Sequence, residues 1–181
     1  MLEAEVKLRL DAARKERLLA SLQAMGALLV GEHRQEDEYF AHPSRDFLAS
    51  DEALRLRESG GRLRITYKGP KLDPPRKTRE EIEFALETDR ENAADLLDRL
   101  GFRAIARVRK LRREHRLPDE PPTVVCIDEV EGLGSFCEIE VEAESVEAGR
   151  ARLASRLVKL GLDDLPPIAE SYLELLGGTR A

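Results

Sequence analysis

The sequence predicts an α+β fold in which an antiparallel sheet closes on itself and helices pack against it. The first observation is a period-two alternation at residues 2–10, which puts charged residues on one face of a strand and apolar residues on the other. The second is that this alternation returns in later segments, with some charged faces purely basic and others purely acidic. Unmixed like charges destabilise neighbouring strands, so we expect a closed sheet that encloses them with water and counter-charges.

The elements of the first half follow from local signals. Asp11 caps a helix that runs to about Met25, and Gly26 stops it. A long strand should then extend to about Phe40. Gly60 and the glycine after it suit the turn of a hairpin between two arginine-bearing strands. Residues 71–77 form a basic loop that we expect at the mouth of the enclosed space.

The second half repeats this order. Thr88 or Asp89 caps a helix that ends at Gly101, and a basic strand follows over residues 102–117. A glycine-rich turn at 132–134 joins the last two strands. Ser145 caps a helix to about residue 160, and a short helix lies near Tyr172. We therefore expect one domain of 181 residues made of two β-α-β-β-β halves, about 1–70 and 76–145, plus C-terminal helices.

An ordinary antiparallel sheet accounts for the same alternation. Helices would cover its apolar face and water its charged face, with no enclosed space. The richness of the charged faces favours the closed sheet, because burying so many charges requires water, ions and a highly charged ligand.

Two sets of charged residues define that ligand. Clustered carboxylates repel one another unless a cation lies among them, and oxygen ligands suit Mg²⁺ or Mn²⁺. The expected metal ligands are Glu3, Glu5, Asp128, Glu138 and Glu140, with Glu81 assisting. Clustered cations suit an anion of several charges, and arginine fits phosphate oxygens bidentately. The expected cations are Lys7, Arg55, Arg57, Arg64, Lys68, Lys110 and Arg112. Metal and cations together predict a polyphosphate site.

Seven sequence blocks also resemble the CYTH superfamily, the triphosphate tunnel metalloenzymes, in the order typical of that family. They begin with an ExExK signature and include Asp51-Glu52-Ala53-Leu54-Arg55-Leu56-Arg57, Thr66-Tyr67-Lys68-Gly69-Pro70, Arg79-Glu80-Glu81-Ile82-Glu83 and Glu138-Ile139-Glu140. The blocks look most like the branch called class IV adenylyl cyclases. This resemblance implies an eight-stranded antiparallel barrel, or triphosphate tunnel, with helices outside. It implies the same metal ligands and, apart from Arg64, the same triphosphate ligands. It also admits a homodimer.

The resemblance implies an enzyme that acts on a triphosphate. We expect a cyclase that converts ATP to cyclic AMP and pyrophosphate. The expected catalytic residues are Lys7, Glu81 and Arg112, of which Glu81 is the carboxylate that would activate water if the reaction is hydrolysis. Hydrolysis of tripolyphosphate, a nucleoside triphosphate or thiamine triphosphate is the alternative, and a non-catalytic polyphosphate or nucleotide binder is a third. Thiamine triphosphate is less favoured, because the C-terminal helix of that branch carries a lysine and residues 161–181 have none.

Composition also bears on which classes of partner the protein can bind and on its location in the cell. The net charge of −6 disfavours nucleic-acid binding. No apolar run approaches the ~20 residues of a membrane span and no signal peptide precedes Leu2, so we expect a cytoplasmic protein without membrane contact. Cys126 and Cys137 fall on opposite faces by parity, which argues against a disulfide.

Overall fold

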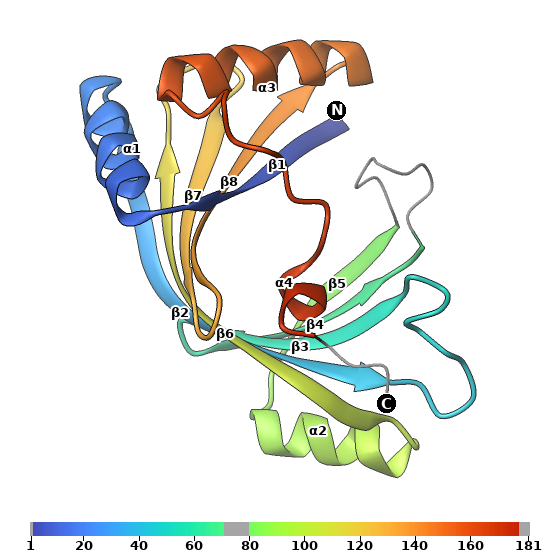
Figure 1. Ribbon diagram of the computed structural model, residues 1–181. Coiled ribbons are helices and arrows are strands. Elements are labelled where there is room, and N and C mark those ends of the chain that lie inside the picture. Colours follow the sequence, from blue (N-terminus) through green and yellow to red (C-terminus); the bar gives the residue numbers. More distant parts are fainter. Residues whose placement is uncertain (1, 71–79, 178–181) are drawn as a thin grey trace. The chain divides into compact units, whose positions relative to one another are not determined.

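The computed structural model describes residues 2–70 and 80–177, with no side-chain detail for Leu2 and Glu3. The described part of the chain forms eight strands and four helices, which are labelled in Figure 1. Along the chain they are β1 (Leu2–Leu10), α1 (Ala12–Ala24), β2 (Leu28–Ala41), β3 (Ala53–Ser59), β4 (Arg62–Lys68), β5 (Glu81–Leu86), α2 (Arg90–Arg99), β6 (Arg103–Arg116), β7 (Thr123–Val130), β8 (Gly134–Ala143), α3 (Val146–Leu160) and α4 (Tyr172–Leu175).

The prediction of a closed eight-stranded barrel is wrong, because the eight strands form one open sheet. Their order is β1-β8-β7-β6-β2-β3-β4-β5, so that β1 and β5 are its two ends within the described chain. The alternation in the sequence could not predict an open sheet. A period of two shows that each strand has two different faces, but it does not show whether the strands at the two ends of the sheet pair with each other. At the outer edge of β1, the backbone N–H of Ile168 donates a hydrogen bond of 2.8 Å to the carbonyl of Lys7. A loop segment, and not a strand, therefore meets this edge.

The chain divides into two compact units. Unit 1 comprises residues 1–33 and 111–169, and unit 2 comprises residues 34–110 and 170–181. The boundary falls inside β2 and β6, the two longest strands at 14 residues each. The expected division into two duplicated halves follows other boundaries and stays a prediction.

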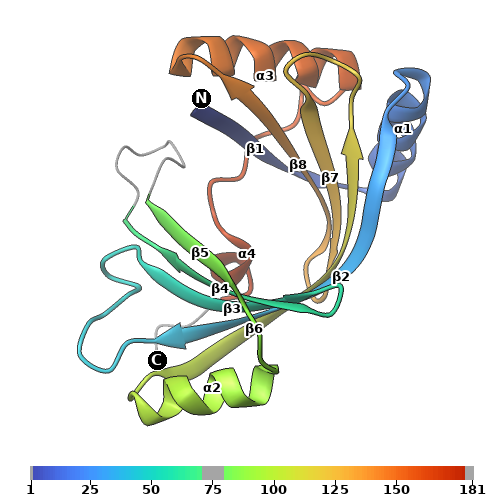
Figure 2. The same ribbon diagram turned by 180° about the vertical axis from the view of Figure 1, so that it is seen from behind.

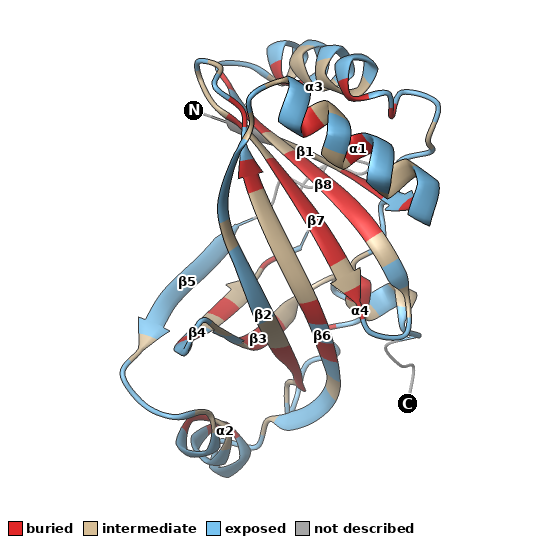
Figure 3. Cartoon of the chain, turned by 90° about the vertical axis from the view of Figure 1, so that its left-hand side faces the viewer, coloured by how far each residue is buried: buried red, intermediate tan, exposed pale blue. Residues whose placement is uncertain are grey.

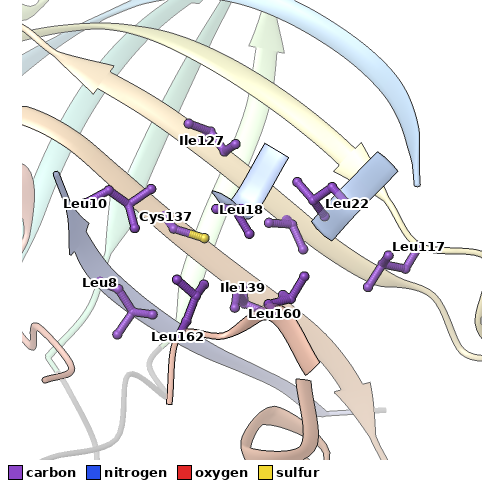
Figure 4. Packing of buried hydrophobic residues seen from close by; sticks show 11 residues of the cluster. Leu8, Leu10, Leu18, Leu22, Leu117, Ile127, Cys137, Ile139, Leu160 and Leu162 are labelled. Carbon is purple, nitrogen blue, oxygen red and sulfur yellow. The ribbon is translucent and has the colours of Figure 1, made fainter. Parts of the chain in front are cut away.

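The core of unit 1 lies between one face of its strands and the helices α1 and α3. Leu18 and Leu22 of α1 and Leu160 of α3 pack against buried residues of β1, β7 and β8 (Figure 4). Figure 3 shows β7 and β8 buried along most of their length, as expected for central strands under a helical layer. Since alternate residues point to opposite faces, this packing leaves the charged parity of β1 and β8 on the other face.

The core of unit 2 lies on the apolar face of β3 and β4, between these strands and α2. Figure 2 labels the three elements. Leu54, Leu56 and Leu63 are buried there against Ala93 and Leu97 of α2. The opposite face of these strands carries Arg55, Arg57, Arg64 and Thr66, in keeping with the alternation in the sequence.

The predicted helix caps and the hairpin turn at Gly60 are confirmed. The side chains of Asp11, Asp89 and Ser145 each accept a backbone hydrogen bond at the start of α1, α2 and α3. Ser171, for which no cap was predicted, does the same at the start of α4. Gly60 and Gly61 join β3 to β4 with φ values of 56° and 73°, which a two-residue hairpin turn requires. The basic loop expected at residues 71–77 lies outside the described residues. No helix in the described ranges has the length and apolar character needed to cross a membrane.

Candidate active site: two charged faces

The charged face of unit 1 is built by β1 and β8, whose register sets acidic and basic side chains opposite one another. Lys7 lies across from Glu138, and Glu5 lies across from Glu140. Directly opposed residues of an antiparallel pair have Cβ atoms about 4.5–5.5 Å apart. The two strands therefore bring four of the predicted site residues onto one small area.

A buried ion network occupies the centre of this face. The guanidinium of Arg112 donates to both carboxylate oxygens of Asp128, at 2.7 Å and 2.6 Å, and also contacts Glu138. The ammonium of Lys7 lies 3.4 Å from the other oxygen of Glu138. Asp128 is fully buried, and Lys7 and Glu138 are nearly so. Burial works against a charged Arg112, yet the bond to Asp128 and the charges of Glu138 and Asp128 together hold the pKa of Arg112 well above its usual range.

The opposed pair Glu5 and Glu140 is the part of this face that suits a metal. Two carboxylates facing each other are unfavourable unless a cation shares them. Mg²⁺ is commonly held by one or two carboxylates, with water and substrate phosphates completing its shell. Asp128 and Glu138 are already bound by Arg112, and the side chain of Glu3 is outside the described residues. In the described ranges no set of three or more acidic, histidine or cysteine side chains is arranged as a metal cage. The donors thus fit a metal that relies on substrate oxygens.

Cys126 lies on the same face, across from Glu138. Burial is the largest influence on this thiol and raises its pKa to about 12, although the charge of Arg112 acts in the opposite direction. The thiol is therefore protonated at neutral pH, which argues against a role as a nucleophile or metal ligand.

The charged face of unit 2 begins with Asp37, a buried carboxylate that binds two arginines. Arg57 forms a bidentate pair with it, through hydrogen bonds of 2.6 Å and 2.6 Å, and Arg55 lies at 3.5 Å. Burial alone raises the pKa of Asp37, but the bonds from Arg57 and the charges of Arg57, Arg55 and Lys110 outweigh it and lower that pKa. Asp37 therefore stays ionised and keeps the two arginines in fixed positions.

The second part of this face joins β3, β4 and β5. Thr66 accepts a hydrogen bond of 3.2 Å from Arg55 and donates one of 2.8 Å to Glu83, which also binds Arg64. Arg55 is only 6% exposed, and its Nε–H is buried with no hydrogen-bond partner among the described residues. A buried donor of this kind is costly unless a ligand satisfies it.

The remaining predicted residues of unit 2 form two further contacts. Lys68 and Glu81 make an ion pair of 2.7 Å between β4 and β5. Lys110 of β6 lies over the ring of Tyr172, with its ammonium 5.0 Å from the ring centroid.

Sequence reasoning did not assign roles to several residues that organise these faces. Asp37, Thr66, Glu83 and Tyr172 hold the predicted cations in place. A signal existed for Glu83, which shares parity with Glu81, whereas the contact of Asp37 with Arg57 depends on the register between β2 and β3. Tyr172 could not be placed at all, because no pattern links the last helix to β6.

Two hollows lie on unit 1. The smaller, of about 140 Å³, is lined by residues that include Arg116, Val124 and Glu140 and so adjoins the acidic pair. The larger, of about 550 Å³, is lined by residues that include Glu142, Glu144 and Arg152, and contains none of the predicted site residues. We give more weight to the smaller hollow, because charged groups and not volume define a site for phosphate and metal.

The chain is similar to known proteins over nearly its whole length. The model of the CYTH domain family matches residues 1–172. A protein of Methanocaldococcus jannaschii named "Putative adenylate cyclase MJ0240" is 36% identical over 182 residues, covering 98% of this chain and 99% of its own. Adenylate cyclase CyaB of Aeromonas hydrophila is 27% identical, over 96% of this chain and 87% of its own. The solved PH1819 protein of Pyrococcus horikoshii matches with a TM-score of 0.79 and 33% identity, over 97% of this chain and 98% of its own.

Proposed function

The chain belongs to the CYTH domain family, and we propose on that basis that it is a metal-dependent enzyme acting on a triphosphate. The observation that carries the proposal is the buried guanidinium of Arg55. Thr66 and Asp37 fix it, and its Nε–H has no hydrogen-bond partner among the residues that the structure describes. Arginine forks match phosphate oxygens, and a donor held in place loses little entropy when it binds them.

We assign the reaction first to the conversion of ATP to cyclic AMP and pyrophosphate, in keeping with the names of the two adenylate cyclase relatives. In this reaction the ribose 3′-hydroxyl gives up its proton to water and its oxygen bonds to the α-phosphorus. The bond between the α-phosphorus and the oxygen that bridges it to the β-phosphorus breaks, and pyrophosphate leaves. Lys7 and Arg112 are proposed to stabilise the charge that develops on the phosphate oxygens. Arg55, Arg57, Arg64, Lys68 and Lys110 are proposed to bind the phosphate chain.

The metal ligands of this proposal are Glu5 and Glu140, with Glu138 and Asp128 further along the same face and Glu3 continuing the same parity. Bound Mg²⁺ or Mn²⁺ supplies neutralisation of phosphate charge and polarisation of the phosphorus–oxygen bonds. Asp128 and Glu138 have a second task, since they orient Arg112 and Lys7.

Hydrolysis of a triphosphate is the second candidate. A cyclase must also hold the adenine of ATP, and the candidate aromatic and hydroxyl side chains of unit 2 for this task are Tyr39, Phe40 and Ser171. Phe40 belongs to the core of unit 2, and Ser171 caps α4. Tyr39 is 9% exposed and lies against Arg55 and Asp37. These three side chains therefore have structural tasks and are not available to bind adenine. A hydrolase that acts on the phosphate chain does not need to bind adenine. Glu81, held by Lys68, is the proposed group that activates water in this reaction.

A product assay separates the two reactions. Purified protein is incubated with ATP or with tripolyphosphate, each with Mg²⁺ or Mn²⁺, and the products are separated by chromatography. Cyclic AMP with pyrophosphate supports the cyclase, whereas orthophosphate without cyclic AMP assigns the protein to the triphosphatases.

Arg55→Gln tests the phosphate site itself. Loss of a charge-assisted hydrogen bond should weaken tripolyphosphate binding roughly 10- to 100-fold. Arg99→Gln is the matched control, because Arg99 is exposed on α2 and its ion pair is with Asp95 of the same helix. Equal affinities for the two variants, or no binding and no turnover by the wild type, would reject the proposal. The cytoplasmic location, the homodimer and the absence of nucleic-acid partners stay predictions.

A further inference from the structure

The last helix of the described chain is unusually short and unusually well fixed. The helix α4 has four residues, fewer than an isolated helix needs to be stable. A complete capping box begins it: the backbone N–H of Glu174 donates to the hydroxyl of Ser171, and the backbone N–H of Ser171 donates to the carboxylate of Glu174. The box defines the position of the next residue, Tyr172.

Tyr172 is the buried residue of this helix, at 7% exposure, and it lies under a buried cation. The ammonium of Lys110 is 5.0 Å from the ring centroid, and Lys110 is 6% exposed. Cation–π attraction is strongest when water is excluded from the pair, as it is here. The four rotatable bonds of a lysine otherwise leave its ammonium free to occupy many positions.

The charge of Lys110 also acts on the other charged residues of the proposed phosphate-binding face. Its positive charge contributes to lowering the pKa of Asp37, the carboxylate that binds Arg57 and Arg55. A displacement of Lys110 would therefore change the charge balance around both arginines as well as its own contact with an anion.

We propose that Tyr172 is a positioning residue whose ring holds the ammonium of Lys110 where it meets a phosphate oxygen of the substrate. The capped turn α4 thereby sets triphosphate affinity without touching the substrate. The effect on triphosphate affinity rests on the proposed function. The fixed position of the Lys110 ammonium rests on its contact with Tyr172 alone.

Affinity for tripolyphosphate, measured by calorimetry, tests the consequence. Tyr172→Leu keeps an apolar side chain and removes the π face, and should weaken binding roughly 5- to 30-fold. In enzyme kinetics the same variant should raise KM far more than it lowers kcat. Tyr172→Phe retains the ring and should recover most of the affinity lost in Tyr172→Leu. Leu176→Ala, on the exposed end of the same segment, is the control for general disturbance.

A double-variant cycle decides whether Tyr172 acts through Lys110. In a Lys110→Met background, Tyr172→Leu should cause no further loss of affinity. An equal loss in both backgrounds would overturn the inference, because Tyr172 would then act without Lys110. A loss in Tyr172→Phe as large as in Tyr172→Leu would overturn it too, since the hydroxyl and not the ring would be responsible.

A ligand-free readout keeps this inference separate from the proposed function. In NMR spectra of the unliganded protein, the ring should shift the Lys110 side-chain protons upfield, and Tyr172→Leu should abolish that shift. If the shift is present but no triphosphate binds, the proposed function fails and the positioning contact stands. If the shift is absent from the wild type, the positioning role fails whatever the protein binds.

Discussion

At the scale of single residues, Asp37 is the carboxylate on which the cations of unit 2 depend. It is buried, and its two oxygens are both bound by Arg57 while Arg55 lies close by. Removing one partner of a buried charge pair leaves the other charge buried and uncompensated, which costs more stability than replacing both partners with apolar residues.

Asp37→Asn should therefore destabilise the protein by about 3 kcal/mol in urea unfolding. Asp95→Asn is the matched control, because the Asp95–Arg99 pair is an exposed i,i+4 contact that water and salt screen, so its loss should change stability little. A loss for Asp37→Asn no larger than the control would show that Arg57 and Arg55 do not need this carboxylate in the folded state.

His115 supplies a pH dependence of stability. It is 8% exposed, and burial is the main reason that its pKa is lowered, with the charge of Arg113 acting in the same direction. Below about pH 6.5 the unfolded chain takes up a proton that the folded protein resists. The stability contributed by neutral His115 should be present above that pH, and lost as pH falls towards the lowered folded value.

Urea unfolding at about pH 7.5 and about pH 5.5 measures this effect. The wild type should lose stability between the two values, and His115→Gln should lose less. His33→Gln, at an exposed position of β2, should follow the wild type. An identical pH dependence in His115→Gln and the wild type would rule out His115 as the cause.

At the scale of elements, the pairing of β1 with β8 sets Glu5 against Glu140 and gives a test for the metal. Mn²⁺ should raise the melting temperature of the wild type, because a ligand that binds only the folded state stabilises it. Glu5→Gln and Glu140→Gln should each reduce this rise, whereas Glu147→Gln, exposed in the first turn of α3, should preserve it. An undiminished rise in the first two variants would place the metal elsewhere.

Single helices and strands were predictable from the sequence, but whether the sheet closes was not. Asp11, Asp89 and Ser145 predicted the starts of three helices, because a cap is a contact within one turn. The alternation in β1 and β8 correctly separated the core parity from the charged parity for the same local reason. An open or closed sheet depends on whether β1 meets β5, strands that lie about 70 residues apart in the chain, and no local pattern contains that information. The register that joins Asp37 to Arg57 is likewise a property of two strands together.

At the scale of the whole molecule, the charge balance opposes the proposed substrate while the local charges attract it. The net charge is −6, so a triphosphate is repelled at long range and attracted only near the cationic faces. Salt screens both effects, but it screens exposed groups far more than buried ones, since the Debye length falls from roughly 14 Å to roughly 4 Å between about 50 mM and about 500 mM salt.

Two arginines of unit 2 allow the different screening of exposed and buried charges to be measured. The side chain of Arg64 is 49% exposed and that of Arg55 is 8% exposed, although both pair with Glu83. Tripolyphosphate affinity is measured for the wild type, Arg64→Gln and Arg55→Gln at both salt concentrations. The deficit of Arg64→Gln relative to the wild type should shrink towards nothing at high salt, and that of Arg55→Gln should persist. If both deficits vanish together, the phosphate is held by diffuse surface charge, and the buried donor of Arg55 is not what binds it.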